Sequence, residues 1–307
     1  MARVFVTHEL PFPALERLRA AHDVDVWPKP APPPPEELRL RAAHADALLT
    51  MLTDRVDDDL LAAAPAVRAV ANLAVGTDNV DLEAARRRGV QVGNTPDVLT
   101  AATADLAMAL LLASARGLTA GEARVRSGDW GPWQPAEDLG ADLDGATLGI
   151  VGLGRIGQAV SDRASAFGLR VVHRSRSSGL PLGDVLERSD FVSLHAPLTP
   201  DTRHIIDADA LRRMRPTAHL VNTARGGLVD QRALAQALQA GEIAGAALDV
   251  TDPEPLPPDD PLLRAPNLIV VPHIGSATRR TRARMADLAV DNLLAALAGR
   301  PMPHAAT

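Results

Sequence analysis

A strand-like run followed by three spaced glycines constrains the fold more than any other part of the chain. Residues 147–160 read TLGIVGLGRIGQAV: an apolar run leads into Gly152, Gly154 and Gly157, and a helical pattern follows. The first glycine of such a loop permits a tight turn, the second lets the backbone approach a pyrophosphate, and the third lets helix and strand pack closely. A turn without a ligand is the alternative. The flanking strand and helix favour a dinucleotide-binding unit with the phosphates at the helix N-terminus.

Short apolar runs alternate with helical patterns along the rest of the chain. About five such runs precede residue 96, and six more follow from residue 147, most of them apolar without interruption. Continuous apolar runs are typical of parallel strands that helices cover on both faces. Because 307 residues are enough for two cores, the pattern predicts an α/β fold. We expect two doubly wound domains, Rossmann-like or flavodoxin-like, with a cleft between them.

A long apolar helix is expected to begin near Thr100 and to include LAMALLLASA, residues 106–115. Its nearly uniform hydrophobicity indicates burial, and we place the hinge between the domains here. The apolar run is shorter than the roughly 20 residues that span a bilayer. The N-terminus, MARVFVTHELPF, does not read as a signal peptide. We therefore expect a cytoplasmic protein without a membrane partner.

Composition excludes several functional classes. The net charge of -6 offers no basic surface for a polyanion, so we expect a small-molecule partner and no nucleic acid. The chain has no cysteine, which removes disulfides, thiolate metal sites and cysteine nucleophiles. None of the nine histidines forms an HxH or HExxH cluster, so we expect no metal site.

The stretch VVHRSRSSG, residues 171–179, lies where a dinucleotide fold reads the ribose, roughly 20 positions after the first glycine of the loop. A carboxylate here would bind a 2′-hydroxyl group and repel a 2′-phosphate. Arg174 and Arg176, with Ser175, instead offer hydrogen-bond donors to a dianion. The stretch therefore favours NADP(H), with NAD(H) as the weaker alternative. A solvated basic turn that contacts no cofactor is the other interpretation.

Three ionisable residues stand just beyond the ends of successive predicted strands: Arg225 in HLVNTARGG, Glu254 in ALDVTDPEP and His273 in IVVPHIGSAT. Open α/β sheets bind ligands at this edge. Taken singly, each has an ordinary structural explanation, as surface charge, as an acid in a proline turn or as a strand cap. Together they suit hydride transfer to a ketone, which needs a proton donor, a carboxylate that orients the donor, and a cation for the developing charge.

Seven segments of the chain resemble the D-isomer-specific 2-hydroxyacid dehydrogenases and, within that family, the glyoxylate/hydroxypyruvate reductases. The segments are LAVGTDNVDLEAARRRGVQVGNTPDVLTAATADLAMALLL, SGDWGPW, GLGRIGQAV, NTARGGLVD, ALDVTDPEPLP, PHIGSATRRTR and NLLAALAGRPMP. Only the first 45 residues match loosely. The resemblance implies NADPH-dependent reduction of glyoxylate or hydroxypyruvate to glycolate or D-glycerate. A broader, D-lactate-like 2-oxoacid reductase and a non-enzymatic NAD(P)-sensing scaffold are the alternatives.

The same resemblance implies roles for the catalytic and substrate-binding residues. His273 would be the acid/base, Glu254 its partner and Arg225 a substrate-binding residue. The backbone amides of Val75 and Gly76 would bind the substrate carboxylate from across the cleft. Further substrate contacts are implied for Leu52, Ser276 and Trp133.

The resemblance also implies a homodimer, formed through the helix near residues 100–115. Trp130 and Trp133 would then approach the substrate from the partner subunit, although aromatic packing in an interface explains them equally well. The chain departs from the commoner family pattern at Arg174, where NAD-dependent members carry an acid.

Cofactor contacts and domain limits complete what the resemblance implies. The substrate domain would be discontinuous, with residues 1–97 plus 279–307, because the final helix returns to it. The dinucleotide-binding domain would comprise residues 98–278. The implied cofactor contacts are Gly152, Gly154, Arg155, Ile156, Gly157, Arg174, Ser175, Arg176, Pro197, Thr202, Thr223, Asp249, His273 and Gly275.

Overall fold

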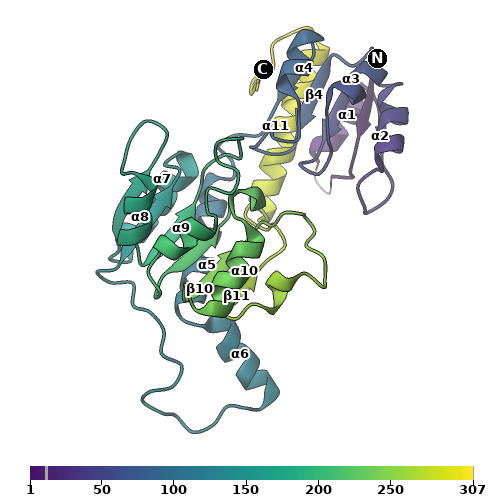
Figure 1. Ribbon diagram of the computed structural model, residues 1–307. Helices are drawn as coiled ribbons and strands as arrows, with labels where there is room; N and C mark the ends of the chain where they lie inside the picture. Colours follow the sequence, from purple (N-terminus) through teal and green to yellow (C-terminus); the bar gives the residue numbers. More distant parts are fainter. Residues whose placement is uncertain (11–12, 307) are drawn as a thin grey trace. The chain divides into compact units, whose positions relative to one another are not determined.

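The computed structural model describes residues 1–10 and 13–306, and the chain divides into two compact units (Figure 1). Unit 1 comprises Met1–Leu99 and Thr278–Thr307, and unit 2 comprises Thr100–Ala277. These limits lie one or two residues from those expected for the two domains. Residues 11, 12 and 307, which the expected first domain includes, lie outside the described residues.

Unit 1 is built on a parallel sheet that has five strands within the described residues, in the order β2-β1-β3-β4-β5. The strands are β1 (Arg3–Val6), β2 (Asp23–Val26), β3 (Ala47–Thr50), β4 (Ala69–Asn72) and β5 (Gln91–Gly93). The helices are α1 (Ala14–Ala21), α2 (Pro35–Ala42), α3 (Asp58–Ala63), α4 (Leu82–Arg87) and α11 (Arg279–Leu297). The order reverses between β1 and β3, and such a switch point opens a crevice at the carboxyl edge of a sheet.

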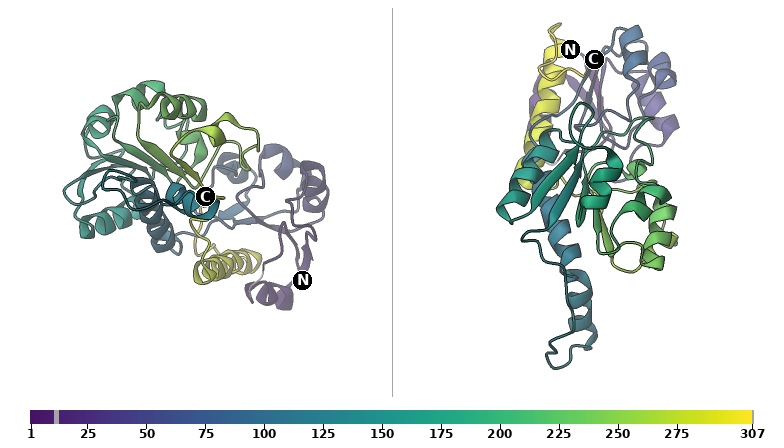
Figure 2. Two further views of the ribbon diagram at one scale, coloured as in Figure 1. Left: turned by 90° about the horizontal axis from the view of Figure 1, so that it is seen from below. Right: turned by 60° about the vertical axis from the view of Figure 1, so that its left-hand side comes forward.

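Helices cover both faces of the sheet in unit 1. α1 and α11 pack together on one face, with α11 against β3, β4 and β5, whereas α2, α3 and α4 cover the other face (Figure 2). Phe5, Leu48 and Val70, from three neighbouring strands, are buried under α2, α3 and α4. α3 and α4 begin after Asp57 and Asp81, whose carboxylates accept a backbone N–H of the first turn.

Unit 2 contains a parallel sheet with six strands in the described part of the chain, in the order β11-β10-β9-β8-β6-β7. The strands are β6 (Thr147–Val151), β7 (Arg170–Arg174), β8 (Phe191–Leu194), β9 (His219–Asn222), β10 (Gly245–Leu248) and β11 (Leu268–Val270). The α-helices are α5 (Thr100–Ala115), α6 (Leu118–Ser127), α7 (Arg155–Ala166), α8 (Leu182–Arg188), α9 (Ala208–Arg213) and α10 (Gln231–Ala240), and two 3-10 turns are η1 (Gly226–Leu228) and η2 (Pro261–Arg264). The order reverses between β6 and β8.

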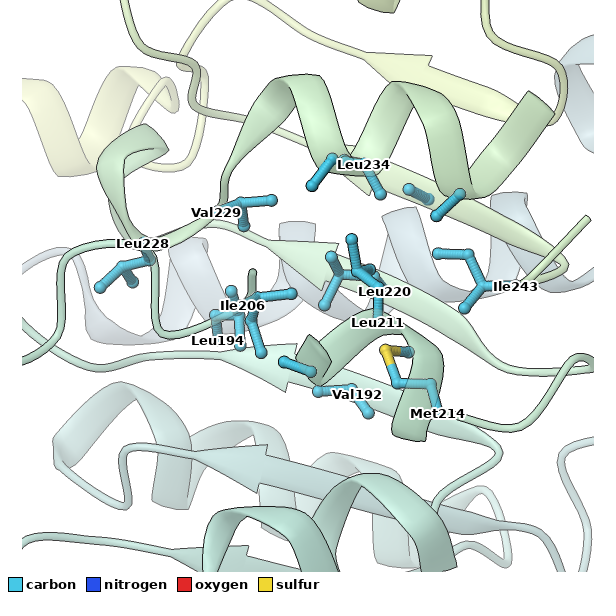
Figure 3. Packing of buried hydrophobic residues seen from close by; sticks show 14 of the residues in the cluster. Val192, Leu194, Ile206, Leu211, Met214, Leu220, Leu228, Val229, Leu234 and Ile243 are labelled. Atoms are coloured by element: carbon cyan, nitrogen blue, oxygen red, sulfur yellow. The ribbon is translucent and has the colours of Figure 1, made fainter. Parts of the chain in front are cut away.

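Two apolar layers enclose the sheet of unit 2. α5 and α7 pack on each other over one face, and α8, α9 and α10 cover the other. Figure 3 shows the second layer, in which Leu211 of α9, Leu234 of α10 and Leu220 of β9 belong to one buried cluster. On the first face α5 buries Met108 and Leu111, as its apolar composition predicts.

The predicted α/β class with two doubly wound domains is confirmed. Every strand that the apolar runs predict is present among the described residues, and all named strands pair in parallel. The runs predict these strands because a strand covered on both faces has no solvent side that requires polar residues. The strands end before their runs do, so the last residues of several runs belong to loops at the carboxyl edge.

α6 and residues 128–140 form an arm that extends away from the sheet of unit 2 (Figures 1 and 2). α6 has no buried side chain. The arm returns to α5 through a hydrogen bond from the Ala141 N–H to the Ala115 carbonyl. Among the described residues, no single helix is long and apolar enough to cross a membrane. α5 and α6 reach that length and composition only as a pair bent by 61°.

Candidate active site

The glycine loop joins β6 to the N-terminus of α7. Gly152 has a φ of 101°, and a Cβ there would lie 2.5 Å from the Ala196 backbone nitrogen. A Cβ on Gly157 would lie 2.2 Å from the Gly152 carbonyl oxygen, whereas a Cβ on Gly154 would meet nothing within 4 Å. The turn and the packing therefore require the first and third glycines. The second leaves open space at the helix N-terminus, where a pyrophosphate fits.

The end of β7 lies next to the glycine loop. The Arg174 carbonyl accepts the Gly152 N–H at 2.8 Å. In the tight turn that follows, the Ser175 hydroxyl is 2.8 Å from the Ser178 hydroxyl, so its side chain is engaged within the turn. Arg174 and Arg176 are exposed, and neither guanidinium group has a hydrogen-bond or ion-pair partner among the described residues. The turn therefore presents two available cations.

The loops after β8 and β9 contain three of the residues expected to contact a cofactor. The Thr202 hydroxyl donates to the Pro197 carbonyl at 2.7 Å and accepts the Thr199 N–H at 2.8 Å, which fixes the first loop. Directly after β9, the Thr223 hydroxyl is buried without a hydrogen-bond partner. Among the described residues, only the Thr95 hydroxyl is in the same state. Buried polar atoms normally have a partner, so Thr223 fits a contact to a bound ligand.

His273 follows β11 and lies beside Glu254 in the loop after β10. The His273 Nδ1 atom is 3.0 Å from one Glu254 carboxylate oxygen, and the other oxygen accepts the Thr251 N–H at 3.0 Å. Burial disfavours the charged carboxylate, but the hydrogen bond and charge of His273, aided by Arg225, hold the pKa of Glu254 below its usual range. A carboxylate at Nδ1 leaves Nε2 as the nitrogen that can transfer a proton.

Arg225 follows β9 in a turn that packs on the loop of Glu254. Asn222 is fully buried, and its Nδ2 atom donates to the Arg225 carbonyl at 2.8 Å, which fixes the turn. At the next residue, a Cβ on Gly226 would lie 2.0 Å from the Thr251 carbonyl oxygen. Only glycine fits between the two loops, and their contact brings Arg225 within electrostatic reach of Glu254.

Asp249 anchors the backbone directly after the catalytic candidate His273. Its two carboxylate oxygens accept the N–H groups of Ile274 at 2.6 Å and Gly275 at 2.8 Å. His273 has a φ of 51°, in the left-handed region that side chains other than glycine rarely adopt. Burial raises the pKa of Asp249, and the two backbone hydrogen bonds oppose that shift. Asp249 therefore helps to hold the backbone conformation that presents the His273 ring.

Sequence reasoning missed Asn222 and His195. The His195 Nε2 atom is 2.8 Å from the Ser193 hydroxyl, and burial lowers the pKa of His195 to about 4, so the ring is neutral at physiological pH. Its backbone also packs against Gly152. The available signal was position: both residues lie at the carboxyl end of an apolar run, where a buried polar side chain must find a partner.

In unit 1, Val75 and Gly76 lie in the loop after β4, and Leu52 lies in the loop after β3. The carbonyl oxygens of Val75 and Gly76 accept hydrogen bonds from Asn94 at 2.7 Å and Asn72 at 3.0 Å. The N–H groups of Val75 and Gly76 have no hydrogen-bond partner in the described structure. Two adjacent N–H groups in this state can bind a carboxylate.

The other expected residues occupy three places in unit 2. Arg155 and Ile156 form the start of α7, and Ser276 is half-buried after Gly275. Trp133 lies on the arm with 85% of its surface exposed. The structure thus brings Arg225, Glu254 and His273 together at the carboxyl edge of the sheet, and it leaves Trp133 in solvent.

Comparisons with known proteins identify the family. A family model described as D-isomer specific 2-hydroxyacid dehydrogenase, NAD binding domain, matches residues 108–275. The chain is 48% identical over 314 residues to a protein named glyoxylate reductase from Korarchaeum cryptofilum, and the match covers 98% of this chain and 95% of that protein.

Two solved structures are similar over the full chain. The TT0316 protein from Thermus thermophilus is 50% identical with a TM-score of 0.95, covering 99% of this chain and 100% of that one. An NADPH-dependent glyoxylate/hydroxypyruvate reductase from Sinorhizobium meliloti, solved with NADP and malonate, is 34% identical with a TM-score of 0.87, covering 100% of this chain and 97% of that one.

These matches confirm the predicted family and enzyme class. The family model spans the glycine loop, Arg225, Glu254 and His273, and the curated relative matches both units. The chain belongs to the D-isomer specific 2-hydroxyacid dehydrogenase family, in the branch of proteins named glyoxylate reductase, and it is an NAD(P)-dependent oxidoreductase.

Proposed function

We propose that the protein reduces glyoxylate and hydroxypyruvate with NADPH, and that His273 is the proton donor. The observation that carries the proposal is the 3.0 Å contact between His273 Nδ1 and the Glu254 carboxylate, with Arg225 in the adjoining turn. This group lies at the carboxyl edge of the sheet that also carries the glycine loop. The similarity to proteins named glyoxylate reductase supports the substrate class.

Each of the three side chains has a separate role in ketone reduction. His273 donates the Nε2 proton to the substrate oxygen as charge develops there, and Glu254 stabilises the positively charged ring through Nδ1. Arg225 offers a planar set of N–H donors to the carbonyl and carboxylate oxygens of the substrate. The bound reduced nicotinamide supplies the hydride. The unpartnered N–H groups of Val75 and Gly76 bind the substrate carboxylate.

The substrate proposal predicts a ranking of 2-oxo acids. With NADPH in excess, we expect kcat/KM for glyoxylate and hydroxypyruvate to exceed that for pyruvate by about tenfold or more, the scale at which one small group is discriminated in a pocket. Steady-state rates with the three acids, each with NADPH and NADH, measure this ranking. A higher kcat/KM for pyruvate would instead assign a D-lactate-like reductase.

We also propose that Arg174 and Arg176 select NADPH through its 2′-phosphate. Replacing Arg174 with aspartate should lower kcat/KM for NADPH by about 10- to 100-fold, because one or two charge-assisted hydrogen bonds are lost and a repulsive charge is added. The value for NADH should change by less than about threefold, since a ribose hydroxyl group carries no charge. Steady-state kinetics with both cofactors give the two ratios.

Arg170→Asp is the matched control for this prediction. Arg170 is exposed at the opposite end of β7, so replacing it with aspartate makes the same change of charge away from the glycine loop. Equal losses with NADPH and NADH in Arg174→Asp, or the same selective loss in Arg170→Asp, would contradict the phosphate assignment. Arg176→Asp, assayed in parallel, compares the contributions of the two arginines.

We propose that the active form is a homodimer, in which the arm joins α5 in the interface. Large apolar side chains with more than half of their surface exposed gather on it: Leu118, Val125, Trp130, Trp133 and Leu139. A concentration of apolar surface on an extended segment is typical of an interface, and a second copy of the chain covers it most simply by two-fold symmetry. A monomeric mass in light scattering at assay concentrations would contradict this proposal.

A further inference from the structure

Two loops at the carboxyl edge of the sheet in unit 1 are joined by side chains. The first, residues 51–55, follows β3 and contains Leu52. The second, residues 73–80, follows β4 and contains Val75 and Gly76. Loops of this kind are normally the least fixed part of a sheet. The side chains that join them are those of Asn79, in the second loop, and Asn72, at the end of β4.

Asn79 forms the direct link between the loops. Its Nδ2 atom lies 3.1 Å from the Met51 carbonyl and 2.8 Å from the Asp54 carbonyl, both in the first loop. Its Oδ1 atom accepts the Asn72 Nδ2 at 3.0 Å, while the Asn79 Nδ2 atom is 3.2 Å from Asn72 Oδ1. One half-buried amide therefore fixes two carbonyl groups of the loop that carries Leu52.

Asn72 extends the link to the loop of Val75 and Gly76. This fully buried residue ends β4, and its Nδ2 atom donates to the Gly76 carbonyl at 3.0 Å. Its Oδ1 atom accepts the Thr50 hydroxyl at 3.2 Å at the end of β3. Because a peptide unit is planar, holding a carbonyl oxygen also fixes the direction of the N–H on the next residue. Asn72 thereby orients the Gly76–Thr77 peptide.

The Asp54 carboxylate connects the first loop to the end of β1. Its Oδ2 atom accepts the Met51 N–H at 2.7 Å and also binds the Thr7 hydroxyl at the end of β1. Burial is the main reason that the pKa of Asp54 is raised. β1 and β3 flank the switch point of the sheet, the place where open α/β sheets bind ligands. The polar network therefore lies at the carboxyl edge of the sheet, beside its switch point.

We propose that Asn79, acting with Asn72, is a positioning residue for substrate binding. The amide pair fixes the Met51 carbonyl, and with it the peptide of Leu52, and the Gly76 carbonyl. With Asn94 on the Val75 carbonyl, it holds the segment that carries the N–H groups of Val75 and Gly76, so that a 2-oxo acid meets a preformed set of donors. Donors held in advance bind more tightly because little conformational entropy is lost on binding. The inference rests on the proposed function, in which those N–H groups bind the substrate carboxylate.

Asn79→Ala tests the inference through the division between KM and kcat. The variant keeps His273, Glu254 and Arg225 but frees the loop carbonyls. We expect KM for glyoxylate and the inhibition constant of oxalate, an unreactive dianion, each to rise about tenfold. A rise of this size is the effect of weakening one charged hydrogen bond to the substrate carboxylate. The value of kcat and the Kd for NADPH should stay within about threefold. Hydrogen exchange should become faster in residues 51–55 and 73–80.

Leu38→Ala is the matched control, because Leu38 is buried in unit 1 on α2 and belongs to its apolar cluster. It should lower Tm without raising KM or the oxalate constant. Equal KM in Asn79→Ala and the wild type, or the same rise in Leu38→Ala, overturns the inference. If the wild type reduces none of the acids, the proposed function fails. The inference is then decided by hydrogen exchange alone: faster exchange of both loops only in Asn79→Ala supports it, and unchanged exchange overturns it.

Discussion

His273→Ala is expected to lower kcat for glyoxylate reduction with NADPH by about 10²- to 10⁴-fold, the usual contribution of a positioned acid or base. The variant removes the ring that Glu254 orients through a 3.0 Å contact to Nδ1. The Kd for NADPH should remain within about threefold, because the glycine loop and the end of β7 are unaltered. Single-turnover rates separate the proton-transfer step from cofactor binding.

His204→Ala controls for backbone strain in this experiment. His204 is exposed in unit 2 and has a φ of 52°, almost the same left-handed conformation as the 51° of His273. Both substitutions place alanine where a Cβ is strained, but only one removes the proposed acid. The assignment of His273 as proton donor is wrong if the two variants lose activity equally, or if His273→Ala retains full turnover.

The fold could be predicted because its main signal is local. An apolar run such as HLVN in β9 is typical of a strand buried on both faces, and the run TLGIV before Gly152 indicates where the chain turns from strand into helix. The same reasoning predicted that Arg225, Glu254 and His273 follow strand ends, and the structure places Glu254 in contact with His273. Their catalytic roles remain proposals.

The supporting contacts of the site could not be predicted, because they depend on loop conformations that no periodic pattern encodes. Asp249 was expected near a cofactor, yet its carboxylate also binds the backbone beyond His273. Ser175 was expected to contact phosphate, yet its hydroxyl is engaged by Ser178. Asn79 carried no signal at all in one sequence, since only the folded loops bring it to the Met51 and Asp54 carbonyls.

Removing the charge of Glu254 should change the pH dependence of the enzyme. The pKa of Glu254 is held below its usual range, so the carboxylate beside His273 stays charged down to acidic pH. Its contribution to turnover is therefore present at neutral pH and is lost as the pH falls through that lowered pKa. In Glu254→Gln we expect kcat/KM for glyoxylate to fall by about 10- to 100-fold at neutral pH, the effect of one lost charge-assisted hydrogen bond.

The pH dependence of the loss distinguishes this role from a structural one. As the wild-type carboxylate becomes protonated at acidic pH, the ratio of wild-type to variant kcat/KM should shrink toward one. Asp252→Asn is the control, since Asp252 lies two residues away in the same loop but pairs with Arg203 at 3.3 Å. It should keep the wild-type pH profile. A loss by the same factor at every pH in Glu254→Gln would show that Glu254 only shapes the loop and does not act through its charge beside His273.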